Sequence, residues 1–100
     1  MISQMGLLKG KYFKAADIPT PIERTINRVR QQHFDDGPKI VLGFENEPQE
    51  AVLNRSNLTI VTDRLGDDEQ GWIGHRVRLH VEQIRVRNTP VGSIRVTVIE

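Results

Sequence analysis

Basic and apolar residues alternate near the end of the chain. The series reads Arg76, Val77, Arg78, Leu79, His80 and Val81. On a β-strand, alternate side chains share a face and lie about 6–7 Å apart. This spacing is similar to the phosphate repeat of an extended single strand, so each basic side chain could neutralise one phosphate. The pattern predicts a contact surface for a single-stranded nucleic acid, such as single-stranded DNA, with an ordinary solvent-exposed sheet face as the alternative.

Other basic residues extend this candidate surface. The predicted nucleic-acid contacts are Lys11, Lys14, Arg76, Arg78, Arg85, Arg87 and Arg95. Lys9, Arg24, Arg28 and Arg30 are additional candidates. After Val81 the alternation of apolar and basic residues shifts by one position, so that Ile84 and Val86 become the apolar residues and the arginines at 85 and 87 the basic ones. We expect these two arginines to continue the basic face.

Aromatic residues that could stack on bases are few. The chain has five aromatics, and none lies within the arginine-rich strand. Phe44 has the parity of apolar neighbours and Trp72 lies beside a glycine-bounded corner, so we assign both to the core. Tyr12, Phe13 and Phe34 remain as candidates. We therefore expect binding that is largely electrostatic and sensitive to salt.

Charge is distributed unevenly along the chain. Residues 1–34 carry six Lys or Arg and two acids, residues 35–71 three basic and nine acidic residues, and residues 72–100 five Arg and two Glu. If the basic ends meet in the fold, they form a positive face that attracts phosphates, beside an acidic centre.

No catalytic or metal-binding constellation is recognisable. The serines lie outside any nucleophile-elbow context, and the glycines form no phosphate-binding loop. His75 and His80 have opposite parity on a strand, so they would not share a face as metal ligands. Residues 67–69 are acidic but match only the first positions of a calcium loop. We expect a protein without cofactor or metal that is not an enzyme.

Composition bounds the class of protein. One hundred residues correspond to one domain, and the absence of cysteine excludes disulfides and favours a reducing, intracellular setting. No segment has the roughly 18 apolar residues that a membrane span needs, and no signal peptide is recognisable. The expected location is the cytoplasm, with no membrane partner.

The elements that must position the basic residues follow from periodicity and turn signals. Residues 1–21 are expected to form an irregular arm, because prolines at 19 and 21 prevent a helix, and residues 22–100 a single domain. The predicted strands cover residues 22–31, 39–44, 50–53, 76–81 with an extension to 87, and 93–99. In the first strand, the parity of apolar residues changes between Ile26 and Val29, which indicates a bend.

One helix is predicted, from a cap at Asn54 or Ser56 to Leu65, with Gly66 as the terminating residue. The order is then β-β-β-α-β-β. This is the order of the OB-fold, a small, partly open, five-stranded barrel with a helix between strands 3 and 4. An α+β roll with the same order is the alternative.

Several segments resemble a family of short, uncharacterised phage and prophage proteins. They are Gly10 to Asp17, Thr25-Ile26, Val52-Leu53-Asn54 with Asn57, Gly66-Asp67-Asp68, Trp72-Ile73-Gly74 and Ile94-Arg95-Val96. They correspond to the family's "KYLKAADL", "VLNKTN", "GDD…WIGK" and "IRV" segments and span nearly the whole chain. The sequence departs from the pattern at Phe13, Ile18, Arg55-Ser56 and His75, where the family has leucine, leucine, lysine-threonine and lysine. The last difference puts a phosphate contact at that position in doubt.

The resemblance implies an accessory role in phage replication or recombination. Two functions are thus expected. The first is binding of single-stranded nucleic acid through a basic sheet face. The second is a protein–protein interaction module, in which the acidic centre and an exposed strand edge bind a phage or host replication or recombination protein.

Overall fold

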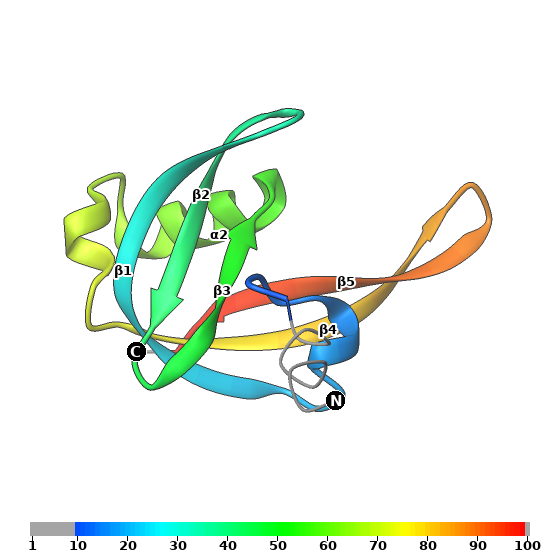
Figure 1. Cartoon of the computed structure of the whole chain (residues 1–100), viewed down its shortest axis with the longest axis horizontal. Helices are drawn as coiled ribbons and strands as arrows, with labels where there is room; N and C mark the ends of the chain where they lie inside the picture. Colours follow the sequence, from blue (N-terminus) through cyan, green and yellow to red (C-terminus); the bar gives the residue numbers. More distant parts are fainter. Residues whose placement is uncertain (1–9, 100) are drawn as a thin grey trace, which may run out of the picture.

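The computed structural model describes residues 10–99 (Figure 1). The strands are β1 (Ile22–Phe34), β2 (Gly37–Phe44), β3 (Glu47–Leu53), β4 (Arg76–Val86) and β5 (Thr89–Val98). Helix α2 (Arg55–Leu65) lies between β3 and β4, and two short 3₁₀ helices, η1 (Ala15–Asp17) and η2 (Glu69–Trp72), precede β1 and β4. The mainly β class and the predicted element order are confirmed.

The long strand β1 joins two halves of one antiparallel sheet, whose order is β3-β2-β1-β4-β5. Residues 22–25 pair with β4, and the part from Ile26 to Phe34 pairs with β2. The register with β2 shifts between Ile26 and Arg28, which leaves Asn27 as the extra residue of a bulge. The bend predicted from the parity change is therefore present, and it lets one strand serve both halves (Figure 1).

Four strands, β1, β2, β3 and β5, are longer than their sequence patterns predicted, and the first and third show the reason. The first continues three residues beyond the expected end at Gln31, because its pairing with β2 runs up to the turn at Asp35 and Asp36. The third begins at Glu47 rather than Glu50, directly after a turn in which Asn46 has a positive φ of 56°. In both cases hairpin pairing extends the strand beyond its apolar residues.

Strand β4 is continuous, and the predicted change of phase within it is wrong. Its register with β5 runs without a shift from the Val77–Val98 pair to the Val86–Thr89 pair. Arg87 and Asn88 form the connecting turn with φ values of 52° and 66°, the two positive values of a type I′ hairpin. The switch of apolar parity at Ile84 occurs instead because the hairpin extends beyond the core.

Helix α2 has the ends that the sequence predicted. The side chain of Asn54 accepts a hydrogen bond of 2.8 Å from the backbone N–H of Asn57, and Gly66 ends the helix with a φ of 87°. Val61 is buried, with Leu58 and Leu65 packed against the core. Within residues 10–99, no helix is long and apolar enough to cross a membrane.

The core is built mainly from aliphatic residues around two aromatics. Phe44 and Trp72 are almost fully buried, as predicted, and the indole N–H of Trp72 donates a 2.9 Å hydrogen bond to the carbonyl of Gly66. The arm contributes Ile18, which is also buried. The described part of the arm is thus packed on the domain.

The sheet is not closed into a barrel, because other segments occupy its two outer edges. On β3, Phe13 N–H donates to the carbonyl of Glu50 at 2.8 Å, and the N–H of Glu50 donates to the carbonyl of Lys11 at 2.9 Å. On β5, the side chain of Asn57 binds the carbonyl of Ile94 and the N–H of Val96. The arm and α2 therefore stand where the two edge strands of a closed barrel would pair.

Candidate functional site

The alternating basic residues form a stripe on the outward face of β4. Val77 and Leu79 between them are 0% exposed, so Arg76, Arg78 and His80 point to the opposite face, as the alternation predicts. Arg95 of β5 lies directly across from His80 in the pairing. We call the set Arg76, Arg78, His80 and Arg95 the arginine stripe.

Carboxylates from the same face are bound to this stripe. Glu23 accepts hydrogen bonds from Arg76 at 2.7 Å and from Arg78 at 2.9 Å. The hydrogen bond from Arg78 lowers the pKa of Glu23, and the charge of Arg76 lowers it further. Glu82 lies 3.6 Å from Arg95 and 3.7 Å from His80. The stripe is consequently a mixed-charge surface.

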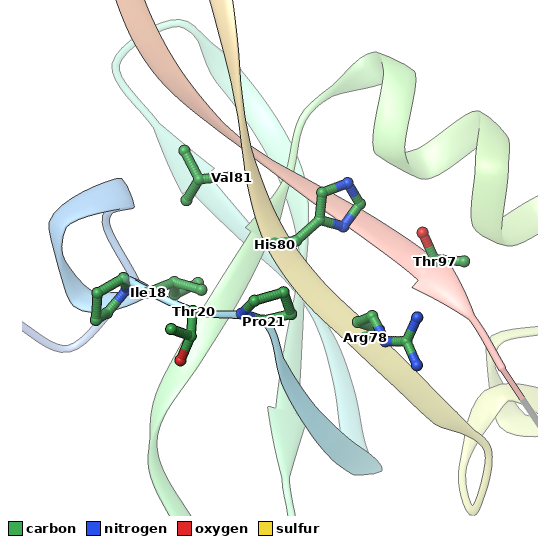
Figure 2. A pocket seen from close by; sticks show the side chains of 8 residues that line it. Ile18, Thr20, Pro21, Arg78, His80, Val81 and Thr97 are labelled. Atoms are coloured by element: carbon green, nitrogen blue, oxygen red, sulfur yellow. The ribbon is translucent and has the colours of Figure 1, made fainter.

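A shallow pocket of about 360 Å³ lies beside the stripe. Its walls are Ile18, Pro19, Thr20, Pro21, Arg78, His80, Val81 and Thr97. Figure 2 shows Arg78, His80 and Thr97 on one side of the β4 ribbon, with Val81 on the other. Any ligand entering here would meet two basic side chains and the hydroxyls of two threonines, but would have to compete with Glu23 for Arg78.

The other predicted contacts lie elsewhere on the molecule. In the unbroken register, Arg85 points to the face opposite Arg76 and Arg78, and Arg87 lies in the hairpin turn. Lys11 and Lys14 belong to the arm at the edge of β3 and are exposed, and Lys9 lies outside the described residues. The predicted set is therefore divided among three places.

The expected separation between a basic face and an acidic centre is wrong. Glu47 of the acidic centre accepts a 2.9 Å hydrogen bond from Arg24, and Glu50 accepts one of 2.8 Å from Arg30. Both arginines belong to β1, which the strand pairing places beside the acidic segment. Opposite charges from distant parts of the chain thus neutralise one another on the sheet.

A second cluster of chemistry-bearing residues lies where the arm meets β1 and β2. The rings of Tyr12 and Phe34 are in edge-to-face contact, with centroids 5.6 Å apart and an interplanar angle of 63°. Lys11 Nζ lies 5.7 Å from the Tyr12 centroid, and Lys39 Nζ lies 5.9 Å from that of Phe34. Both rings are partly exposed. We call the set Lys11, Tyr12, Arg30, Phe34 and Lys39 the aromatic surface.

Glu50 fixes the base of the aromatic surface. Glu50 is 6% exposed, and its carboxylate binds Arg30, whose other contacts include the hydroxyl of Tyr12 at 3.4 Å. Burial raises the pKa of Glu50, but the hydrogen bond from Arg30 and the charges of Arg30, Lys11 and Arg28 outweigh it, so the pKa lies below its usual value. Glu50 therefore remains charged and holds a guanidinium against the tyrosine.

Sequence reasoning named Tyr12 and Phe34 as candidates for base stacking but missed that the two rings meet. They are 22 positions apart, and the arm reaches Phe34 through backbone hydrogen bonds to β3 rather than through a pattern of its own. The one local signal for this surface was Tyr12 itself, an aromatic residue next to a lysine and outside any predicted strand. Nothing in the spacing identified its partner.

Titratable side chains of the described residues form ion pairs and no metal-binding cluster. Across residues 10–99, no group of three His, Asp or Glu side chains could hold a metal ion. The lowered carboxylate pKa values at Glu23, Asp36 and Glu50 each come with a bound arginine or lysine. Each of these three carboxylates is thus held in an ion pair with a basic side chain.

Comparison with known proteins adds no relative: no family model, curated protein or solved structure matches the chain.

Proposed function

We propose that the protein binds single-stranded nucleic acid and that the aromatic surface is its main contact. The observation that carries this proposal is the pair of partly exposed rings, Tyr12 and Phe34, each with a lysine ammonium within 6 Å of its centroid. Bases stack on such rings without regard to sequence, at about 1–3 kcal/mol per base. Lys11 supplies a charge for a phosphate between stacked bases. Lys39 is bound to Asp36 at 3.0 Å, so a phosphate would have to displace that exposed carboxylate.

The fold supports the same choice of surface. We propose that the sheet is an open variant of the OB-fold, because the element order and the bent first strand shared by two sheet halves agree with it. OB-folds bind oligonucleotides on the face of strands 2 and 3 and on the β1–β2 and β4–β5 loops. Lys39 and Phe34 border the first of these loops, and Tyr12 lies on the edge of β3.

The arginine stripe has a secondary part in this proposal. Arg76 and Arg78 are bound to Glu23, and a phosphate would have to displace that carboxylate. Nucleic-acid binding and the resemblance to phage and prophage proteins together support one role. We propose that the protein is a cytoplasmic accessory protein in phage replication or recombination, without catalytic activity.

The alternative of a protein–protein interaction module also has support. The acidic residues Asp63, Asp67, Asp68 and Glu69 are all exposed on the helical side of the molecule. A basic surface of a replication or recombination protein would complement them.

Fluorescence anisotropy with a labelled single-stranded oligonucleotide of about 15 nucleotides tests the proposal, since one OB-fold covers about 4–16 nucleotides. Titrations at about 50 mM and 200 mM salt measure the electrostatic part, which must weaken as salt rises. We expect Phe34→Ala and Tyr12→Ala each to weaken binding by about 5- to 150-fold, the equivalent of one lost stacking contact.

Matched controls separate stacking from folding and charge. Tyr12→Phe keeps the ring and should bind like the wild type, and His33→Ala changes the exposed neighbour of Phe34 on the same strand. Absence of binding at the lower salt concentration would refute the function. Unchanged binding by both alanine variants, with loss in Arg78→Ala, would move the site to the arginine stripe.

A further inference from the structure

The large apolar side chains exposed within residues 10–99 belong to two short stretches of chain. They are Ile60 at 36%, Ile73 at 44%, Val86 at 49% and Val91 at 41% exposure. Ile60 lies within α2 and Ile73 directly follows η2, whereas Val86 and Val91 lie on the β4–β5 hairpin. Figure 1 places η2 and the tip of this hairpin at opposite ends of the molecule's longest axis.

The end of the β4–β5 hairpin, residues 84–91, is an amphipathic ribbon. Ile84 pairs with Val91, and Val86 follows two positions later on the same face, so three apolar side chains form one patch. Arg85 lies on the other face and Arg87 in the turn. This stretch contains two arginines and no acid, and we call it the basic ribbon.

The stretch from Ile60 to Ile73 has the opposite charge. It contains four acidic residues and one arginine. Asp63, Asp67, Asp68 and Glu69 are all exposed. The exposed isoleucines lie at its two ends, and we call it the acidic end.

We propose that copies of this protein associate head to tail, the basic ribbon of one copy binding the acidic end of the next. The apolar face of the ribbon would pack against Ile60 or Ile73, while Arg87, in the turn at the end of the ribbon, pairs with the carboxylates beside them. Arg85, on the other face, adds to the positive charge of the ribbon without entering the contact. Each copy carries both the positively charged ribbon and the negatively charged acidic end. The opposite charges of these two surfaces therefore favour a second copy of this chain as the binding partner. The two surfaces lie too far apart in one molecule to bind each other (Figure 1).

Such an interface is heterologous, so it leaves one free surface at each end and permits chains of copies. Each contact is small and in part ionic, which predicts weak association that salt opposes. The aromatic surface takes no part in it. The inference therefore stands independently of nucleic-acid binding, although chains of copies would make binding along a strand cooperative.

Sedimentation velocity of the full chain from about 5 to 500 µM tests the proposal, because weak contacts require concentrations in this range. At low salt we expect the average mass to rise with concentration beyond that of a dimer, and to return to the monomer at high salt. A ribbon-blocked protein, Arg85→Ser with Val86→Ser and Arg87→Ser, should remain a monomer. An end-blocked protein, Asp67→Ser with Glu69→Ser and Ile73→Ser, should also remain a monomer.

Mixing the two blocked proteins gives the decisive result. Each retains one intact surface, so the mixture should form a one-to-one dimer and nothing larger. All six substitutions are at exposed positions, and circular dichroism verifies that both proteins fold. A wild type that stays monomeric at low salt, or an association that both blocked proteins retain, would overturn the proposal. Monomeric wild type with loss of oligonucleotide binding only in the ribbon-blocked protein would assign the ribbon to nucleic acid instead.

Discussion

The side-chain amide of Asn57 donates a 2.9 Å hydrogen bond to the backbone carbonyl of Ile94, 37 positions further along the chain. Its amide oxygen also accepts from the N–H of Val96 at 3.2 Å. One side chain thus provides both a donor and an acceptor, as a neighbouring strand would. It satisfies backbone groups on the outer edge of β5 and fixes α2 to the sheet.

Replacing Asn57 should destabilise the protein strongly. Asn57→Ala leaves two backbone groups of β5 without partners, which we expect to cost about 2–4 kcal/mol, given about 1–3 kcal/mol for each unsatisfied buried group. Asn57→Asp should cost at least as much, because it places a second acceptor against the carbonyl of Ile94. Urea denaturation measures both. Ser56→Ala, on the exposed side of the same helix, should change stability little, and equal effects at the two positions would contradict the role of Asn57.

Glu50 should make stability depend on pH. Its folded-state pKa is lowered, so its contribution is complete above the unfolded value of about 4.3 and is lost as the pH falls through the folded value. Glu50→Gln lacks this contribution. We expect the variant to be less stable than the wild type at pH 7 and the difference to shrink in acid. Thermal unfolding of both proteins from about pH 7 to pH 3 measures the difference, and a gap that stays constant would contradict it.

Gly92 should control the attachment of the arm. A Cβ at this position would lie 3.0 Å from Cβ of Ala15 and 3.2 Å from Cγ1 of Val81. Gly92→Val should therefore push η1 away from β5 and loosen the bonds between the arm and Glu50. We expect faster amide hydrogen exchange at Phe13 and Glu50, together with weaker oligonucleotide binding through Tyr12. Gly71→Ala, where an added Cβ meets nothing within 4 Å, is the matched control and should leave both unchanged.

Trp72 should be a large contributor to stability. Trp72→Phe removes the hydrogen bond to Gly66 and part of a buried side chain, and we expect a loss of about 1–3 kcal/mol in the free energy of unfolding. Circular dichroism with urea measures the loss, because the variant has no tryptophan for fluorescence. Ile73→Ser, at the exposed neighbour, should cost far less.

Sequence patterns predicted the parts of the fold that depend on interactions between residues close together in the chain. The cap at Asn54, the helix end at Gly66 and the burial of Trp72 follow from signals within a few residues, and each is present. The bulge at Asn27 followed from a parity break in one strand. Where a rule failed, as at Ile84 and Val86, the apolar residues lie on a ribbon that extends beyond the core, and a periodicity cannot show where a core ends.

The candidate site was less predictable, because it depends on contacts between distant segments. The arginine stripe was found from spacing alone, but Glu23, which binds two of its members, comes from another strand. The contact between Tyr12 and Phe34 requires the arm to lie along β3, which no pattern in residues 10–21 indicates. Register between strands decides both, and register follows from tertiary packing.

The division of β1 between two partners also bears on how the chain reaches this structure. Its pairing with β2, and that of β4 with β5, join neighbours through tight turns, whereas residues 22–25 must find partners at 76–79 across more than half the chain. Closing so long a loop carries an entropic cost before any contact compensates for it. We therefore expect the two hairpin units to form early and their junction along the first residues of β1 to be the slow step of folding.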